Sequence, residues 1–98
     1  MLKVGGIWVS PVEVENCLST HPAVLESAVV GSKDDQGLIK PKAFVVLREG
    51  FNPSGDLSEK LKKWVQDRMA KYKYPRWIEF VKELPKSTTG KILRFKLR

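Results

Sequence analysis

Two mainly apolar stretches of the chain, residues 23–31 and 41–47, constrain its fold more than any other feature. Each run has the length of a strand and is rich in Val and Ala, and Gly31 ends the first one. Residues 32–37 between them are polar and end in Gly37, as expected of a turn. The pattern therefore predicts two strands that could pair antiparallel across this turn.

Two amphipathic helices are predicted, one before this strand pair and one after it. Ser10 is placed as the N-cap of the first helix, with Pro11 at the first helical position and Glu13 at the capping-box position. The segment from Asp56 to Glu59 has the same capping form and predicts the start of the second helix, which ends near residue 70. The predicted apolar stripes consist of Val14, Cys17, Leu18 and His21 in the first helix, and of Leu57, Leu61, Trp64, Val65 and Met69 in the second.

Shorter apolar runs complete the predicted architecture. Residues 77–81 predict a third strand, and residues 2–4 and 7–9 predict a two-stranded hairpin hinged on Gly5 and Gly6. The glycine pair also suits a place where another group must approach the backbone closely. The expected fold class is α+β: a small sheet of about three strands flanked by two or three helices, with an N-terminal two-stranded hairpin.

Length and composition limit the class of protein. A chain of 98 residues is expected to form one domain with a modest core. Its single cysteine excludes an intramolecular disulfide, so a reducing cytoplasm is the expected location. No apolar run has membrane-spanning length, and no membrane partner is expected.

The positive charge is concentrated at the C-terminal end. The chain has a net charge of +7, and residues 71–98 hold nine Lys or Arg against only two acids, Glu79 and Glu83. Within this part, residues 72–76 alternate aromatic and cationic side chains, which suits stacking on a base while phosphate is bound. An anionic partner is therefore predicted: a phosphorylated small molecule, a nucleic acid or an acidic protein surface.

Three residue types that often mark catalytic or metal sites are interpreted here as structural. Cys17 lies in an apolar helical stripe with no base placed to activate it. His21 is the only histidine and is interpreted as a helix-end residue, and Asp34 and Asp35 as solvated turn residues. No metal site is predicted.

A lysine follows a turn near the end of the chain. Residues 84–90 contain Pro85, a run of hydroxyl side chains and Gly90, and Lys91 comes directly after them. This arrangement presents one positive charge at a defined point.

Three segments together resemble the C-terminal domain of the adenylate-forming, or acyl-CoA synthetase, superfamily. The first is Lys3-x-x-Gly6-x-x-Val9-x-Pro11-x-Glu13-x-Glu15, the second is Tyr72-Lys73-Tyr74-Pro75-Arg76, and the third is Leu84-Pro85-Lys86-x-Thr88-x-Gly90-Lys91-Ile92-x-Arg94. Residues 36–46 and 72–76 look most like those of benzoate and related aryl-CoA ligases. The resemblance covers residues 1–98, which are expected to be the C-terminal lid domain without the large N-terminal domain.

The resemblance implies a division of roles between two surfaces of the lid. Lys91 would be the catalytic lysine of the adenylation half-reaction, in which a carboxylic acid and ATP give an acyl-adenylate. In the thioester half-reaction, Gly5, Gly6 and Trp8 would line the pantetheine tunnel. The coenzyme A nucleotide would meet Tyr72, Lys73 and Arg76.

The same resemblance implies the substrates and partners. These are ATP, with Mg held mainly by the absent N-terminal domain, coenzyme A as co-substrate, a small carboxylic acid, and that N-terminal domain. The isolated chain is expected to be inactive, since it lacks an ATP-phosphate loop and an acid pocket. Two alternatives stay open: the lid of an adenylating enzyme that does not use coenzyme A, and a small basic nucleic-acid-binding module. The second is disfavoured because known nucleic-acid-binding signatures are absent from the sequence, so no nucleic-acid partner is predicted.

Overall fold

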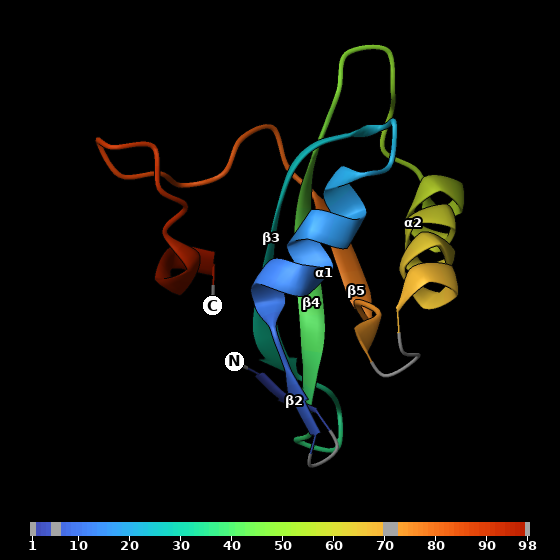
Figure 1. Cartoon of the computed structure of the whole chain (residues 1–98), viewed down its shortest axis with the longest axis vertical. Coiled ribbons are helices and arrows are strands. Elements are labelled where there is room, and N and C mark those ends of the chain that lie inside the picture. The colour runs from blue at the N-terminus through green and yellow to red at the C-terminus, as the bar shows by residue number, and fades with distance from the viewer. Residues whose placement is uncertain (1, 5–6, 70–72, 98) are drawn as a thin grey trace.

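The computed structural model describes residues 2–4, 7–69 and 73–97 (Figure 1). Its elements, in chain order, are β1 (Leu2–Val4), β2 (Ile7–Val9), α1 (Pro11–Ser19), β3 (Val24–Lys33), β4 (Ile39–Leu47), α2 (Gly55–Arg68), β5 (Trp77–Phe80) and a short 3-10 helix, η2 (Arg94–Leu97). The predicted α+β class is confirmed.

The main sheet has three strands in the order β3-β4-β5. β3 and β4 are antiparallel, as predicted, and the turn between them is fixed by Asp34, whose Oδ1 accepts hydrogen bonds from the N–H groups of Gln36 and Leu38. Gly37 completes the turn with φ of +78°, a conformation that favours glycine. β5 runs parallel to β4, because α2 carries the chain back across the sheet between them.

The N-terminal strands pair with one another rather than with the main sheet. β1 and β2 are antiparallel, with Leu2 opposite Val9 and Val4 opposite Ile7, so the predicted hairpin pairing is confirmed. Gly5 and Gly6, which the sequence places at its hinge, lie outside the described residues.

Both helices begin at serine caps. Ser10 Oγ accepts a hydrogen bond from the N–H of Glu13, as predicted. The predicted cap of α2 at Asp56 is wrong, because the cap is Ser54, two residues earlier: the helix begins at Gly55, and Ser54 Oγ accepts the N–H of Leu57. Glu59, three residues after Asp56, matched the capping-box pattern. Leu57, three residues after Ser54, is apolar and does not match it.

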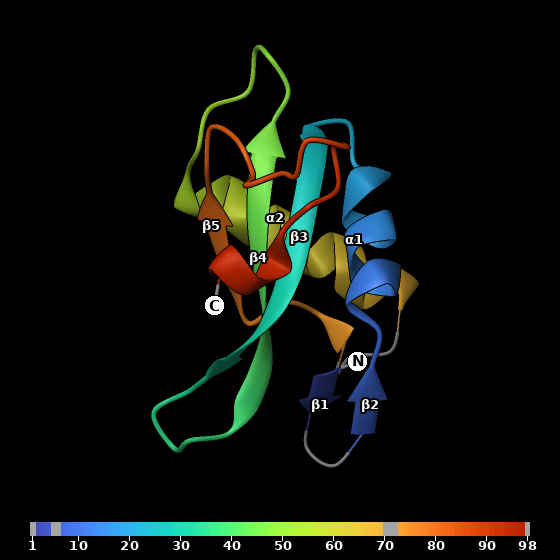
Figure 2. The same ribbon diagram turned by 90° about the vertical axis from the view of Figure 1, so that its left-hand side faces the viewer.

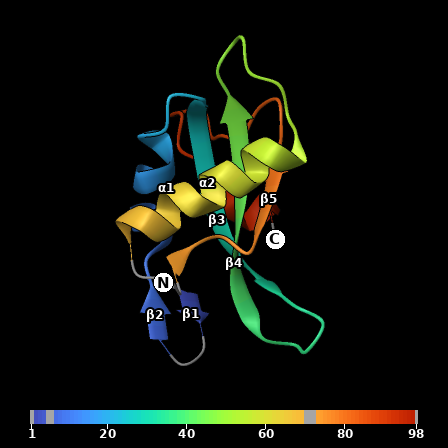
Figure 3. The same ribbon diagram turned by 90° about the vertical axis from the view of Figure 1, so that its right-hand side faces the viewer.

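The core lies on both faces of the main sheet. α1 and α2 cover one face (Figure 3), where Leu18, Leu61 and Val65 are fully buried. The segment after β5 covers the opposite face (Figure 2), where Leu84 packs with Phe44. Complete burial of each such aliphatic side chain stabilises the fold by about 1.5–3 kcal/mol. The C-terminal segment is therefore a packed layer of the domain.

Candidate functional site

The loop that carries Lys91 is a narrow turn closed by its own hydrogen bonds. The N–H of Ser87 donates to the carbonyl of Lys91 over 2.9 Å, and the N–H of Gly90 donates to the carbonyl of Ser87 over 2.9 Å. Ser87 Oγ accepts the N–H of Lys91 at 3.2 Å. Gly90 has φ of +83°, so the turn uses the backbone freedom of glycine. We call residues 87–91 the lysine turn.

Lys91 is exposed at the end of this turn. Among the described residues it has no carboxylate within ion-pair distance. The structure thus places Lys91 on a hydrogen-bonded turn and leaves it accessible, as the sequence predicted.

Two ion pairs fasten the chain on either side of the lysine turn. Before the turn, Lys86 Nζ pairs with Glu26 Oε1 of β3. After it, Arg94 at the start of η2 pairs with Glu15 of α1: Arg94 Nε donates to Glu15 Oε2 over 2.9 Å, and a terminal nitrogen of Arg94 donates to Oε1. The carboxylate of Glu15 raises the pKa of Arg94 further, against the effect of burial.

Glu15 is a buried carboxylate whose structural role the sequence analysis missed. Only 7% of the residue is exposed, and its Oε2 also accepts the N–H of Val29 at 2.7 Å. A glutamate early in an amphipathic helix is ordinarily solvated. Glu15 and Arg94 are the last defined positions of two of the motifs quoted above, and no periodicity signal places them in contact.

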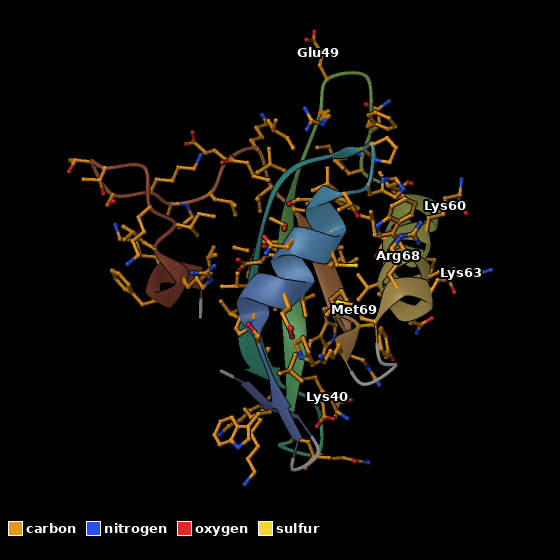
Figure 4. All side chains as sticks on the ribbon, viewed as in Figure 1. Lys40, Glu49, Lys60, Lys63, Arg68 and Met69 are labelled. Atoms are coloured by element: carbon orange, nitrogen blue, oxygen red, sulfur yellow. The ribbon has the colours of Figure 1, made fainter. Side chains whose placement is uncertain are left out.

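Of the residues predicted to meet a coenzyme A nucleotide, the structure describes Lys73 and Arg76. Tyr72 lies outside the described residues. Lys73 is half-buried and pairs with Glu13 over 3.2 Å, whereas the Arg76 side chain is exposed. Arg76 borders a pocket of about 490 Å³ that is lined by cationic, acidic and uncharged polar side chains: Glu59, Lys62, Lys63, Gln66, Asp67, Tyr74 and Arg76. Lys60 and Lys63 project from the side of α2 that faces away from the sheet (Figure 4).

Of the predicted tunnel residues, the structure describes Trp8, which lies on β2. Gly5 and Gly6 are outside the described residues, but Trp8 of β2 is 59% exposed, with Lys3 Nζ 5.8 Å from its ring centre. Figure 1 shows β1 and β2 at one end of the long axis, well separated from the loop drawn in orange and red that holds Lys91. The strand that carries Trp8 and the loop that carries Lys91 are therefore distinct regions of the domain.

The groups interpreted as structural have structural environments. Burial raises the pKa of the Cys17 thiol, which disfavours the reactive thiolate. His21 Nδ1 accepts the N–H of Ala23, and its ring packs edge-on against Trp64. The backbone N–H of Leu38 lowers the pKa of Asp34. Within residues 2–4, 7–69 and 73–97, no three His, Cys, Asp or Glu side chains cluster as metal ligands, and no helix has both the length and the hydropathy to cross a membrane.

Residues 13–91 match the family model of the AMP-binding enzyme C-terminal domain. The chain belongs to this family. Among relatives of this AMP-binding C-terminal domain, the benzoate–CoA ligase of Thauera aromatica is 61% identical over 98 residues, which are all of this chain and 19% of that protein. The 4-hydroxybenzoate–CoA/benzoate–CoA ligase of Rhodopseudomonas palustris is 49% identical over all of this chain and 18% of its own length.

Solved structures of the family have the same fold. The anthranilate CoA ligase AuaEII, crystallised with anthranoyl-AMP, matches with a TM-score of 0.95 and 61% identity over 100% of this chain and 19% of that one. A benzoate CoA ligase from Burkholderia xenovorans LB400 matches with a TM-score of 0.88 and 62% identity over 93% and 18% of the two chains. The chain spans 18–19% of the length of these relatives.

Proposed function

We propose that this chain is the mobile C-terminal domain of an ATP-dependent aryl-CoA ligase, with benzoate or a related aromatic acid as substrate. Support comes from the identity of 61% to 62% with two benzoate–CoA ligases and from the fold shared with a ligase that holds an aroyl-adenylate. The exposed Lys91 on its closed turn carries the proposal, because adenylation requires a positive charge delivered to the reacting phosphate.

In the adenylation half-reaction, a carboxylate oxygen of the acid attacks the α-phosphorus of ATP. The bond from that phosphorus to the bridging oxygen breaks, and pyrophosphate leaves with the bonding electrons. Negative charge grows on the non-bridging oxygens of the α-phosphate, and the Lys91 ammonium stabilises it without giving up a proton. This stabilisation requires the lysine turn to keep the Lys91 ammonium at a fixed position. The hydrogen bonds of Ser87 support that position because they close the turn.

In the thioester half-reaction, the thiol sulfur of coenzyme A attacks the acyl carbon of the adenylate. The bond from the acyl carbon to the AMP oxygen breaks, AMP leaves with the bonding electrons, and the thiol proton passes to solvent. Gly5, Gly6 and Trp8 are proposed to line the tunnel for the pantetheine arm, and Tyr72 to stack on the nucleotide base. Arg76 is exposed and available for phosphate, whereas Lys73 would exchange its contact with Glu13 for one. Rotation of the domain between the two half-reactions would bring each surface to the active site in turn.

The test is the variant Lys91→Ala in the complete ligase that carries this chain, with the two half-reactions assayed separately. Adenylation is followed by the release of pyrophosphate from ATP and benzoate, and thioester formation by the conversion of preformed benzoyl-adenylate with coenzyme A. Removal of a preorganised donor of this kind costs about 100- to 1,000-fold in rate, so adenylation should fall by that factor and thioester formation should persist. Lys60→Gln, which removes an exposed cation of α2, is the control and should change neither rate.

Each other result excludes a specific part of the proposal. Equal loss of both half-reactions in Lys91→Ala would contradict the division between two surfaces. Adenylation without any thioester product would indicate an adenylating enzyme with another acceptor. The isolated 98-residue chain should not exchange pyrophosphate with ATP, and measurable exchange would contradict its role as a domain that completes an active site held elsewhere.

A further inference from the structure

The ion pair between Glu15 and Arg94 joins the two ends of the domain's chain. Its partners are separated by 79 residues in the sequence, and Arg94 comes only three residues after Lys91, the last residue of the lysine turn. The Glu15 side chain is almost fully buried, with 9% of it exposed, whereas 31% of the Arg94 side chain is exposed. A two-point contact between a planar guanidinium and a carboxylate fixes orientation as well as distance.

Glu15 is itself held in place by the edge of the main sheet. β3 is the outer strand of this sheet, so the outward-facing polar groups of its backbone need partners beyond the sheet. Glu15 Oε2 accepts the N–H of Val29, and the Glu15 carbonyl accepts the hydroxyl of Ser27 at 3.2 Å. The carboxylate offered to Arg94 is therefore a fixed point of the domain.

The segment between the lysine turn and Arg94 is short and restrained by hydrogen bonds. The N–H of Leu93 donates to the carbonyl of Pro85 over 2.8 Å, and Ile92 forms a bridge with Lys86. The three residues from Lys91 to Arg94 span at most about 10 Å when extended, and these contacts restrain them further. Movement of Arg94 would therefore be passed to the backbone of Lys91.

The fastening before the turn is weaker. The side chains of Lys86 and Glu26 are 37% and 31% exposed, and exposed pairs of this kind contribute at most about 1 kcal/mol. The lysine turn thus has one enclosed anchor, at Arg94, and one anchor open to solvent, at Lys86.

We propose that Glu15 and Arg94 are positioning residues for Lys91, and that their ion pair sets the rate of adenylation without contacting a substrate. This proposal rests on the adenylation role proposed for Lys91. Without the pair, the turn keeps its own hydrogen bonds but samples more orientations relative to the sheet, so the ammonium meets the phosphate in fewer encounters. A misplacement of about 1 Å by a distant change can lower a rate by about 100-fold.

The experiment uses Arg94→Met and Glu15→Gln in the complete ligase. Methionine keeps an unbranched stem, and glutamine keeps an oxygen that can accept the N–H of Val29, so both variants preserve packing. Adenylation should fall by about 10- to 100-fold in each, while benzoyl transfer from preformed benzoyl-adenylate to coenzyme A stays within about 2-fold. Lys86→Gln should have a smaller effect on adenylation than either variant, and Lys60→Gln should have none.

A double variant separates positioning from general support of the fold. If Arg94 acts through Lys91, Lys91→Ala with Arg94→Met should adenylate as slowly as Lys91→Ala alone. Equal loss of both half-reactions in Arg94→Met, or a further loss of adenylation in the double variant, would overturn the positioning role. Normal adenylation by Arg94→Met beside impaired Lys91→Ala would refute this inference only, whereas normal adenylation by Lys91→Ala would refute the proposed function.

Discussion

Removal of the Arg94 guanidinium should destabilise the domain more than removal of any exposed cation. In Arg94→Met, the enclosed carboxylate of Glu15 loses two charged donors and keeps only the N–H of Val29. A hydrogen bond to a charged group contributes about 1.5–3 kcal/mol, and partial exposure of Arg94 reduces the total, so we expect a loss of about 2 kcal/mol in the free energy of unfolding. For a domain of this size, this corresponds to a fall in Tm of about 10 °C.

The assay is a double-mutant cycle by urea unfolding of the 98-residue chain, with Glu15→Gln, Arg94→Met and both changes together. The coupling energy should be about 1–2 kcal/mol. The matched control is the exposed pair of Asp56 and Lys60, whose side chains are 83% and 67% exposed and whose coupling should stay below about 0.5 kcal/mol. The reasoning is refuted if the Glu15–Arg94 coupling is no larger than that of this control.

Three further predictions concern other parts of the domain. Gly90→Ala should slow adenylation in the complete ligase, because a side chain at φ of +83° costs about 1–2 kcal/mol or shifts the turn; Gly50→Ala at φ of +94° adds the same strain away from the turn, and equal slowing would contradict this prediction. Burial, followed by the charges of Arg68 and Lys60, lowers the pKa of His21 below 6.5. The unfolded chain then takes up this proton at higher pH than the folded one, so stability should fall as the pH drops from about 7 to 5, and His21→Asn should flatten the dependence. Leu61→Ala should lower the free energy of unfolding by about 3 kcal/mol, measured with urea, since Leu61 is fully buried between α2 and the sheet.

The elements of the fold follow from local signals in the sequence. Stretches of strand length rich in Val and Ala indicated β3 and β4, and Ser10 with Pro11 marked the start of α1, because caps and apolar patterns act over a few residues. The exposure of Lys91 was also predicted from a local signal, because the turn that ends in Gly90 places the next residue at its end. The predicted start of α2 was wrong because Ser54 and Asp56 are both residue types that cap helices. The hydrogen bond from the N–H of Leu57 to Ser54 Oγ identifies Ser54 as the cap.

The roles of the charged residues were decided by tertiary structure. Lys73 is one of several cations in a basic segment, yet it meets Glu13, 60 residues away, and is half-buried. Such pairs depend on which strand edge and which helix end come together, and charge pattern along the chain does not encode this.

The sequence by itself determined the strands, the two α-helices apart from the start of α2, the exposed lysine and the likeness to a ligase domain. Only the tertiary structure showed that the C-terminal segment is a third layer and that Arg94 closes it against Glu15. The physical reason is the open edge of β3: the backbone N–H of Val29 needs an acceptor, the carboxylate of Glu15 supplies it, and a carboxylate enclosed there requires a cation.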